Sequence, residues 1–219
     1  MNTLETQMMI TKNQIERALR FAKPVFVEQF GSDQSDDLLA AMEAIYRDLE
    51  PGAPHLTNEK NKMLLRIAVD AVALYRVLPA GMPQDEKLAL VQGFVNNWMD
   101  GQFERWIARK VWATPLLHRL YRRWWFRLSN KADEPDGQRF EMVKRQDNLF
   151  HGFNVTRCGL VKYLNQEGAP ELGPFICRGD EHIEKYLPRN VEFKRTQVIA
   201  EGAAYCDFRY YFTDSDSQS

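Results

Sequence analysis

The chain has 219 residues, of which 44% are hydrophobic and 27% are charged, with a formal net charge of −1. This balance excludes an intrinsically disordered chain, and the length suffices to bury a core without cross-links. The small net charge excludes a global field that would attract nucleic acid or a membrane. No basic and apolar leader opens the sequence, and no window approaches the ~20 apolar residues of a membrane span. We therefore expect a cytoplasmic protein with no nucleic-acid partner and no integral membrane segment; homo-oligomer formation is left open.

The first 130 residues predict a helical part. Apolar residues recur at helical spacing, and Thr11 with Gln14 forms a capping-box pattern at the first helix. The third helix is apolar on several faces, which predicts a central position in the core. The predicted helices cover residues 11–30, 35–49, 58–78, 84–111 and 115–128.

A turn-rich linker at residues 130–138 separates this part from a mixed region. We expect a helical part over 1–130 and an α+β part over 140–213, which can also form one continuous domain. In the second part, β-forming and aromatic residues predict strands, and Gly202 marks a hairpin turn. The predicted elements are a strand at 149–156, helices at 158–166 and within 170–187, and a hairpin at 191–199 and 205–212. The fold class is α+β, with the helical part packed on a small antiparallel sheet.

The most unusual segment by composition is 101–131. It holds eight Lys/Arg residues against one acid, and aromatic residues are interleaved. This pattern is typical of a helix that binds a membrane surface or an anionic partner. It is equally typical of a helix that buries its Trp residues and solvates its Arg residues. We favour the second interpretation, with Trp106 and Trp124 or Trp125 buried and Arg122 and Arg123 solvated.

The histidines at 55, 118, 151 and 182 form no metal-binding pattern. A mixed site of Cys177, Asp180 and His182 is conceivable, but its spacing has no sequence support. No phosphate-binding loop, dinucleotide fingerprint or esterase elbow is present. We therefore expect no metal and no cofactor.

Three short patterns in the second part place a thiol beside a polar side chain. The thiols are Cys158, Cys177 and Cys206, and no CxxC pair occurs, so we expect them to be reduced. Cys158 follows a strand and opens a helix, where exposed amides lower the pKa of a thiol. Alternation along 205–212 places Cys206 and Phe208 on one face and Asp207 on the other. Taken singly, each cysteine is more often structural than catalytic.

Taken in order, these patterns resemble the L-2-amino-thiazoline-4-carboxylic acid hydrolase family. The similarity is clearest over residues 153–210, where the order and spacing of the motifs are specific. The motifs are Asn154…Cys158, Gly168-Ala-Pro-Glu-Leu172, Cys177-x-x-Asp180, Arg195-Thr196…Ala200-x-Gly202 and Cys206-Asp207-Phe208.

The resemblance implies hydrolytic opening of a small ring that resembles a cyclic amidine and carries a carboxylate. Water adds at the ring carbon between nitrogen and sulfur and gives N-carbamoyl-cysteine. This reaction needs a base or nucleophile, an acid for the departing nitrogen, and a cation for the carboxylate. The implied roles are base for Asp180 or Asp207, thiol nucleophile for Cys177 or Cys158, carboxylate clamp for Arg195, amidine contact for Asn154, and substrate contact for Cys206.

We prefer Asp180 to Asp207 as the base, since it lies in a loop or at a helix start. We expect Cys177 and Asp180 within one side-chain reach of Asn154 or Arg195. We also expect the helices within 158–187 to cover the Phe208 face of the sheet. The leading function is hydrolysis of a C–N bond in a small non-peptide ring. The alternatives are a non-catalytic module that binds a small ligand and, for segment 101–131, a lipid or protein docking role.

Overall fold

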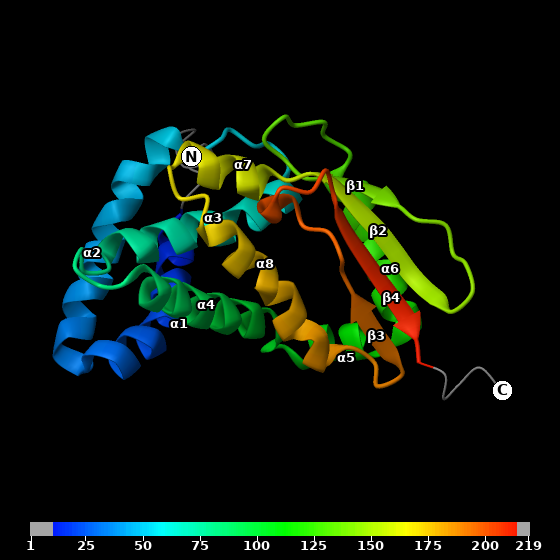
Figure 1. The fold of residues 1–219 in the computed structure, drawn as a ribbon, viewed down its shortest axis with the longest axis horizontal. Helices are drawn as coiled ribbons and strands as arrows, with labels where there is room; N and C mark the ends of the chain where they lie inside the picture. Colours follow the sequence, from blue (N-terminus) through cyan, green and yellow to red (C-terminus); the bar gives the residue numbers. More distant parts are fainter. Residues whose placement is uncertain (1–10, 214–219) are drawn as a thin grey trace, which may run out of the picture.

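The fold comes from a computed structural model that describes residues 11–213. Helices α1 to α4 form one side of the molecule, and a four-stranded antiparallel sheet forms the other, with α8 between them (Figure 1). The predicted α+β class is confirmed. Residues 1–9, where we expected no leader, lie outside the described part.

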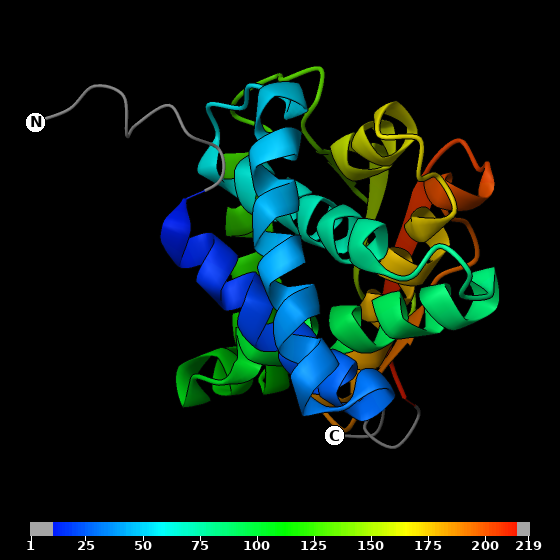
Figure 2. The same ribbon diagram turned by 90° about the vertical axis from the view of Figure 1, so that its left-hand side faces the viewer.

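The helical side is built around α3. Its helices are α1 (Lys12–Phe30), α2 (Ser32–Leu49), α3 (Glu59–Val77) and α4 (Gln84–Asp100). Helix α2 packs against both α1 and α3 (Figure 2). Every residue from Leu65 to Leu74 in α3 is buried, so the predicted central position is confirmed. The predicted cap of α1 forms, because Oε1 of Gln14 accepts a hydrogen bond from the Thr11 N–H at 2.8 Å.

The single helix predicted over 84–111 is wrong. Helix α4 ends at Asp100, a 3₁₀ turn follows at Gly101–Phe103, and α5 spans Trp106–Ala113. The Phe21 ring of α1 packs directly against Gly101, where any side chain would collide with it. One glycine in a helical pattern is a weak signal, so this break could not be predicted. Helix α6 (Pro115–Ser129) begins at a proline, which suits a first helical turn.

The segment between the two parts is fixed to the start of α3. Oε1 of Glu134 accepts hydrogen bonds from the backbone N–H groups of Thr57 at 2.5 Å and Asn58 at 3.0 Å. Oε2 accepts another from the Asn61 side chain at 2.7 Å. A carboxylate at a helix N-terminus satisfies N–H groups that have no partner within the helix. These bonds hold the segment in one place.

The sheet has the order β1-β2-β4-β3, and all its pairs are antiparallel. Its strands are β1 (Arg139–Met142), β2 (Leu149–Arg157), β3 (Val191–Lys194) and β4 (Cys206–Phe212). The short β1 was not predicted. β3 ends at Lys194, before the predicted end at residue 199, so Arg195 lies just beyond the strand. The predicted alternation is confirmed, because Cys206, Phe208 and Tyr210 belong to one buried cluster.

The helices of the second part are α7 (Gly159–Gln166) and α8 (Leu172–His182). Their apolar residues do not cover the Phe208 face as we expected. They join the core of the helical part instead; the members are Leu160, Tyr163, Leu164, Leu172 and Ile176. The Phe208 face is covered by α6, with Phe126 centred 4.3 Å from Phe153 of β2. The sequence indicated which helices and strands have apolar faces, but it did not indicate which helix would pack against the Phe208 face of the sheet.

The prediction for segment 101–131 is partly wrong. Trp125 is buried at 7% exposure, but Trp106 and Trp124 are 64% and 51% exposed. Arg123 is exposed as predicted, whereas Arg122 is half-buried. Its guanidinium lies 4.6 Å from the centroid of the Trp112 ring. Helix α6 therefore packs one apolar stripe against the sheet and exposes a second apolar stripe to solvent.

Candidate active site

Helix α8 brings two of the predicted site residues to the edge of the sheet. Cys177 and Asp180 lie one turn apart on this helix. Gly179 lets α8 approach α4 closely, because a Cβ at this position would lie 2.7 Å from Val95 and 2.9 Å from Met99. The helix therefore holds its polar residues at a fixed distance from both the helical core and the sheet.

Asp180 forms an ion pair with Arg195. Nη1 of Arg195 donates to Oδ2 of Asp180 at 2.9 Å. The Arg195 side chain is 4% exposed, whereas that of Asp180 is 31% exposed. The two residues come from α8 and from the segment after β3, and the predicted proximity of Asp180 and Arg195 is observed. A carboxylate with one face to solvent and the other on a buried cation can contact both water and a bound molecule.

Arg195 also binds two other acceptors. Nη2 donates to the Cys177 carbonyl at 3.1 Å and to Oε1 of Glu181 at 3.1 Å. The guanidinium carbon lies 5.4 Å from the centroid of the Phe208 ring. Burial alone would lower the pKa of Arg195, but Asp180 and the neighbouring groups raise it. The two terminal nitrogens of Arg195 therefore already bind oxygens of the protein.

The pKa of Asp180 is raised because burial disfavours its charged form, although Arg195 and Arg122 act in the opposite direction. A carboxylate with a raised pKa is a stronger base than an ordinary aspartate once it is deprotonated. Such shifts are typical of catalytic carboxylates, although structural ion pairs also produce them.

Cys158 does not have the lowered pKa that we expected from its place at the start of α7. Its sulfur accepts a hydrogen bond from the Gln138 side chain at 3.5 Å, and the N–H groups of Val161 and Leu160 also favour the thiolate. Burial outweighs these contacts and raises the pKa of the Cys158 thiol. The prediction was wrong because a helix terminus lowers a thiol pKa only where solvation of the thiolate is not lost.

The other two thiols are also held in the protonated form. Burial raises the pKa of Cys177 well above its usual value, and the neighbouring Cys158 and Asp180 raise it further. Burial raises the pKa of Cys206 to about 11, although its sulfur accepts the Ile199 N–H at 3.2 Å. The three thiols, Asp180 and Arg195 thus influence one another electrostatically. Their arrangement favours a carboxylate over a thiolate as the activating group.

Asn154 and Asp207 lie on the opposite face of the sheet. They are paired across β2 and β4, and alternation turns both away from the Phe208 face. The Asn154 side chain accepts a hydrogen bond from Arg209 at 2.8 Å. Asp207 binds the backbone of Thr196 and Gln197, beside Arg195. The structure therefore brings together Cys158, Cys177, Asp180, Arg195 and Cys206, but not Asn154 and Asp207.

A second layer of polar groups next to the cluster was not predicted. Nη2 of Arg122 donates to the hydroxyl of Tyr210 at 2.9 Å, and Nε donates to Nε2 of His118 at 3.3 Å. Arg122 is also among the cations that act on Asp180. Alternation along β4 was the one available signal, since it places Tyr210 on the face of Cys206. Nothing in the sequence distinguished Arg122 from the other basic residues of α6.

The described part of the chain contains no cluster of three or more His, Cys, Asp or Glu residues that could hold a metal ion. Among residues 11–213, no helix combines the length and the apolarity that crossing a bilayer requires.

The match to a family model decides the family. The model for L-2-amino-thiazoline-4-carboxylic acid hydrolase matches residues 60–210. The chain belongs to this hydrolase family. The match includes the five clustered residues and leaves α1 and α2 outside it. No curated protein and no solved structure is significantly similar to the chain.

Proposed function

We propose that the chain hydrolyses a small carboxylate-bearing ring at an amidine-like carbon, as the family description suggests, with Asp180 as the general base. One observation carries this proposal: within the segment that the hydrolase family model matches, a carboxylate that is 31% exposed and has a raised pKa is held on a buried arginine beside three thiols. A general base needs a pKa nearer to neutrality than an exposed aspartate has, together with access to water.

In the proposed reaction Asp180 takes a proton from water, and the water oxygen bonds to the ring carbon between nitrogen and sulfur. The carbon–nitrogen π electrons move to the ring nitrogen, which takes the proton from Asp180. Asp180 then removes the proton of the adduct's hydroxyl group as the carbonyl forms and the carbon–sulfur bond breaks, and it passes this second proton to the leaving sulfur. An N-carbamoyl product keeps both nitrogens on this carbon. It therefore requires rupture of the C–S bond, rather than of the C–N bond that we expected from the sequence.

Arg195 is proposed to bind the substrate carboxylate at the position of Glu181. The Glu181 side chain is 56% exposed and lies 3.1 Å from Nη2 of Arg195. Since the Glu181 side chain can move into solvent, a substrate carboxylate can take its place on Arg195 without disturbing the bond between Arg195 and Asp180. A carboxylate on arginine is a strong, charge-assisted contact. Glu181→Ala should then lower KM for a carboxylate substrate, because a competing group is removed.

The test uses 2-amino-thiazoline-4-carboxylate as substrate, with mass spectrometry for the product and a thiol reagent for the released sulfhydryl. Asp180→Asn should lower kcat/KM by about 100-fold or more. Its melting temperature should be reported beside that of Asp37→Asn, an exposed control on α2. The kcat/KM of the unaltered chain should rise with pH through an inflection above the ~3.9 of an ordinary aspartate. Full turnover by a folded Asp180→Asn would exclude this base.

The alternative is a binding module that does not turn its ligand over. The raised pKa values of all three thiols favour it, because such thiols are poor nucleophiles. This module would bind the ring compound stoichiometrically without forming product, and Asp180→Asn would bind it equally well. Product formation that depends on Asp180 excludes this alternative.

A further inference from the structure

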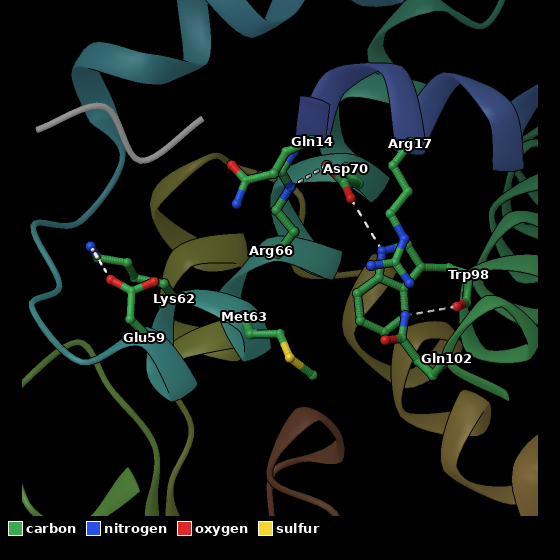
Figure 3. Close-up of a pocket in the computed structure, with 9 residues that line it drawn as sticks. All are labelled: Gln14, Arg17, Glu59, Lys62, Met63, Arg66, Asp70, Trp98 and Gln102. Atoms are coloured by element: carbon green, nitrogen blue, oxygen red, sulfur yellow. Dashed lines mark hydrogen bonds and ion pairs between the residues drawn. The ribbon is translucent and has the colours of Figure 1, made fainter. Parts of the chain in front are cut away.

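A second polar site lies between α1, α3 and α4 and shares no lining residue with the Asp180 cluster (Figure 3). The cavity has a volume of about 120 Å³. Its lining residues are Gln14, Arg17, Glu59, Lys62, Met63, Arg66, Asp70, Trp98 and Gln102. Since ~10–15 Å³ suffices for one water molecule, this space accommodates a ligand of several non-hydrogen atoms.

The unusual group in this cavity is Arg66. The residue is 7% exposed, and its Nε donates to Oδ1 of Asp70 at 3.1 Å. Among the described residues, no group accepts a hydrogen bond from its buried Nη1 or Nη2. A buried donor without an acceptor is costly, and more so on a charged group. The Nη1 and Nη2 groups of Arg66 are thus two buried hydrogen-bond donors on the wall of the cavity, and both are available to a ligand.

Asp70 fixes the direction in which Arg66 points. It is 2% exposed and accepts two further hydrogen bonds, from the Tyr46 hydroxyl at 2.9 Å and from the Trp98 indole at 3.2 Å. Three donors therefore hold this carboxylate in place, and none of them is an Nη atom of Arg66. Figure 3 shows Arg66 and Asp70 joined on α3, with Arg17 reaching toward Trp98 from α1.

The charges of the cavity favour an anion. Lys62 and Glu59 pair with each other at 2.7 Å, and Arg66 pairs with Asp70. Arg17 remains as one excess cation, and its only acceptor among the described residues is the Gly101 carbonyl, at 3.4 Å from Nη2. Neutralising it would require a single negative charge. Met63 and Trp98 add apolar surface to the same wall.

From this geometry we infer that the cavity binds a small monocarboxylate with a short apolar body. The carboxylate accepts two parallel hydrogen bonds from Nη1 and Nη2 of Arg66, which is the geometry that a guanidinium fork offers. Arg17 supplies the neutralising charge, and the apolar body lies against Met63 and Trp98. This site does not depend on the proposed hydrolysis, since it shares no residue with the Asp180 cluster.

Propionate is the probe, measured by titration calorimetry and by the shift of the Trp98 indole N–H in NMR spectra of the full chain. We expect saturable millimolar binding. Arg17→Gln should weaken it by about tenfold, which corresponds to about 1.4 kcal/mol. Arg20→Gln is the matched control, because Arg20 lies on the same helix and pairs with Glu104 outside the cavity. Arg66→Lys, which keeps the charge but loses the fork, should also weaken binding.

Four results would overturn the inference. They are the absence of saturable binding, equal effects of Arg17→Gln and Arg20→Gln, equal binding of neutral 1-propanol, and phosphate binding as tight as that of propionate. The last would assign the cavity to a general anion rather than to a carboxylate with an apolar body. If Arg66→Lys fails to fold, the comparison of Arg17 with Arg20 still decides, because both of these side chains are on exposed residues.

Discussion

Asp207 holds Thr196 with both of its carboxylate oxygens. Oδ1 accepts a hydrogen bond from the Thr196 N–H at 2.8 Å, and Oδ2 accepts one from its hydroxyl at 2.8 Å. Oδ1 also accepts the N–H of Gln197 at 2.6 Å. Because Thr196 directly follows Arg195, these bonds fix the backbone from which the guanidinium reaches Asp180. The geometry supports a positioning role for Asp207 from the far face of the sheet.

Asp207→Asn should therefore destabilise the chain. The amide can replace one accepting oxygen but not both, and a charge-assisted hydrogen bond is lost, at a cost of about 1–3 kcal/mol. Urea unfolding measures this change in the free energy of unfolding. Thr196→Val, which removes only the hydroxyl, should cost less. A fully stable but inactive Asp207→Asn would instead indicate that Asp207 is the base.

The thiols should react slowly in the folded chain. Since burial raises the pKa values of Cys158, Cys177 and Cys206, little thiolate is present near neutral pH. A disulfide-exchange reagent should label all three rapidly only after denaturant is added. Cys177→Ser should retain turnover within about tenfold if Asp180 activates water. Rapid labelling of one native thiol with parallel loss of turnover would establish a thiol nucleophile instead.

Two buried histidines should make the chain sensitive to acid. Burial and Arg122 lower the pKa of His118 to about 2 and that of His151 to about 3. In the unfolded chain both titrate near ~6.5. Between this value and about pH 3 the unfolded state binds more protons, so the free energy of unfolding falls as the pH is lowered through this window.

His151→Gln should flatten this pH dependence, and His55→Gln, an exposed control, should leave it unchanged. Urea midpoints at several pH values provide the measurement. A His151→Gln variant that loses stability equally at every pH would show that packing, rather than protonation, is what this histidine contributes.

Local patterns predicted more of the site than of its surroundings. Cys177 and Asp180 could be placed together because only two residues separate them, although Asp180 lies in the last turn of α8 and not in a loop or at a helix start as we expected. The alternation of β4 followed from its period of two. The pairing of α6 with the sheet could not be predicted, because several amphipathic faces compete for the same partner. The cavity could not be predicted for a related reason. Arg17 and Arg66 lie on separate helices, and only the folded structure shows that Arg66 is buried without acceptors for its Nη groups.

The last prediction is that the helical part and the sheet part unfold as one unit. Helices α7 and α8 belong to the second part by sequence, yet they pack into the core of the first, α7 on α3 and α8 on α4. Gly179→Ala should disturb both parts, since its methyl group would meet Val95 at 2.7 Å and Met99 at 2.9 Å. Overpacking of this kind costs about 1–3 kcal/mol.

Gly81→Ala is the matched control, because a Cβ there meets nothing within 4 Å. Far-ultraviolet circular dichroism follows the helices, and fluorescence of the Trp residues near the sheet follows the second part. In Gly179→Ala both curves should shift to lower urea by the same amount and stay coincident, because α8 links the two cores. Separate transitions, with only one of them moved by Gly179→Ala, would show instead that residues 1–130 and 140–213 are two independent domains.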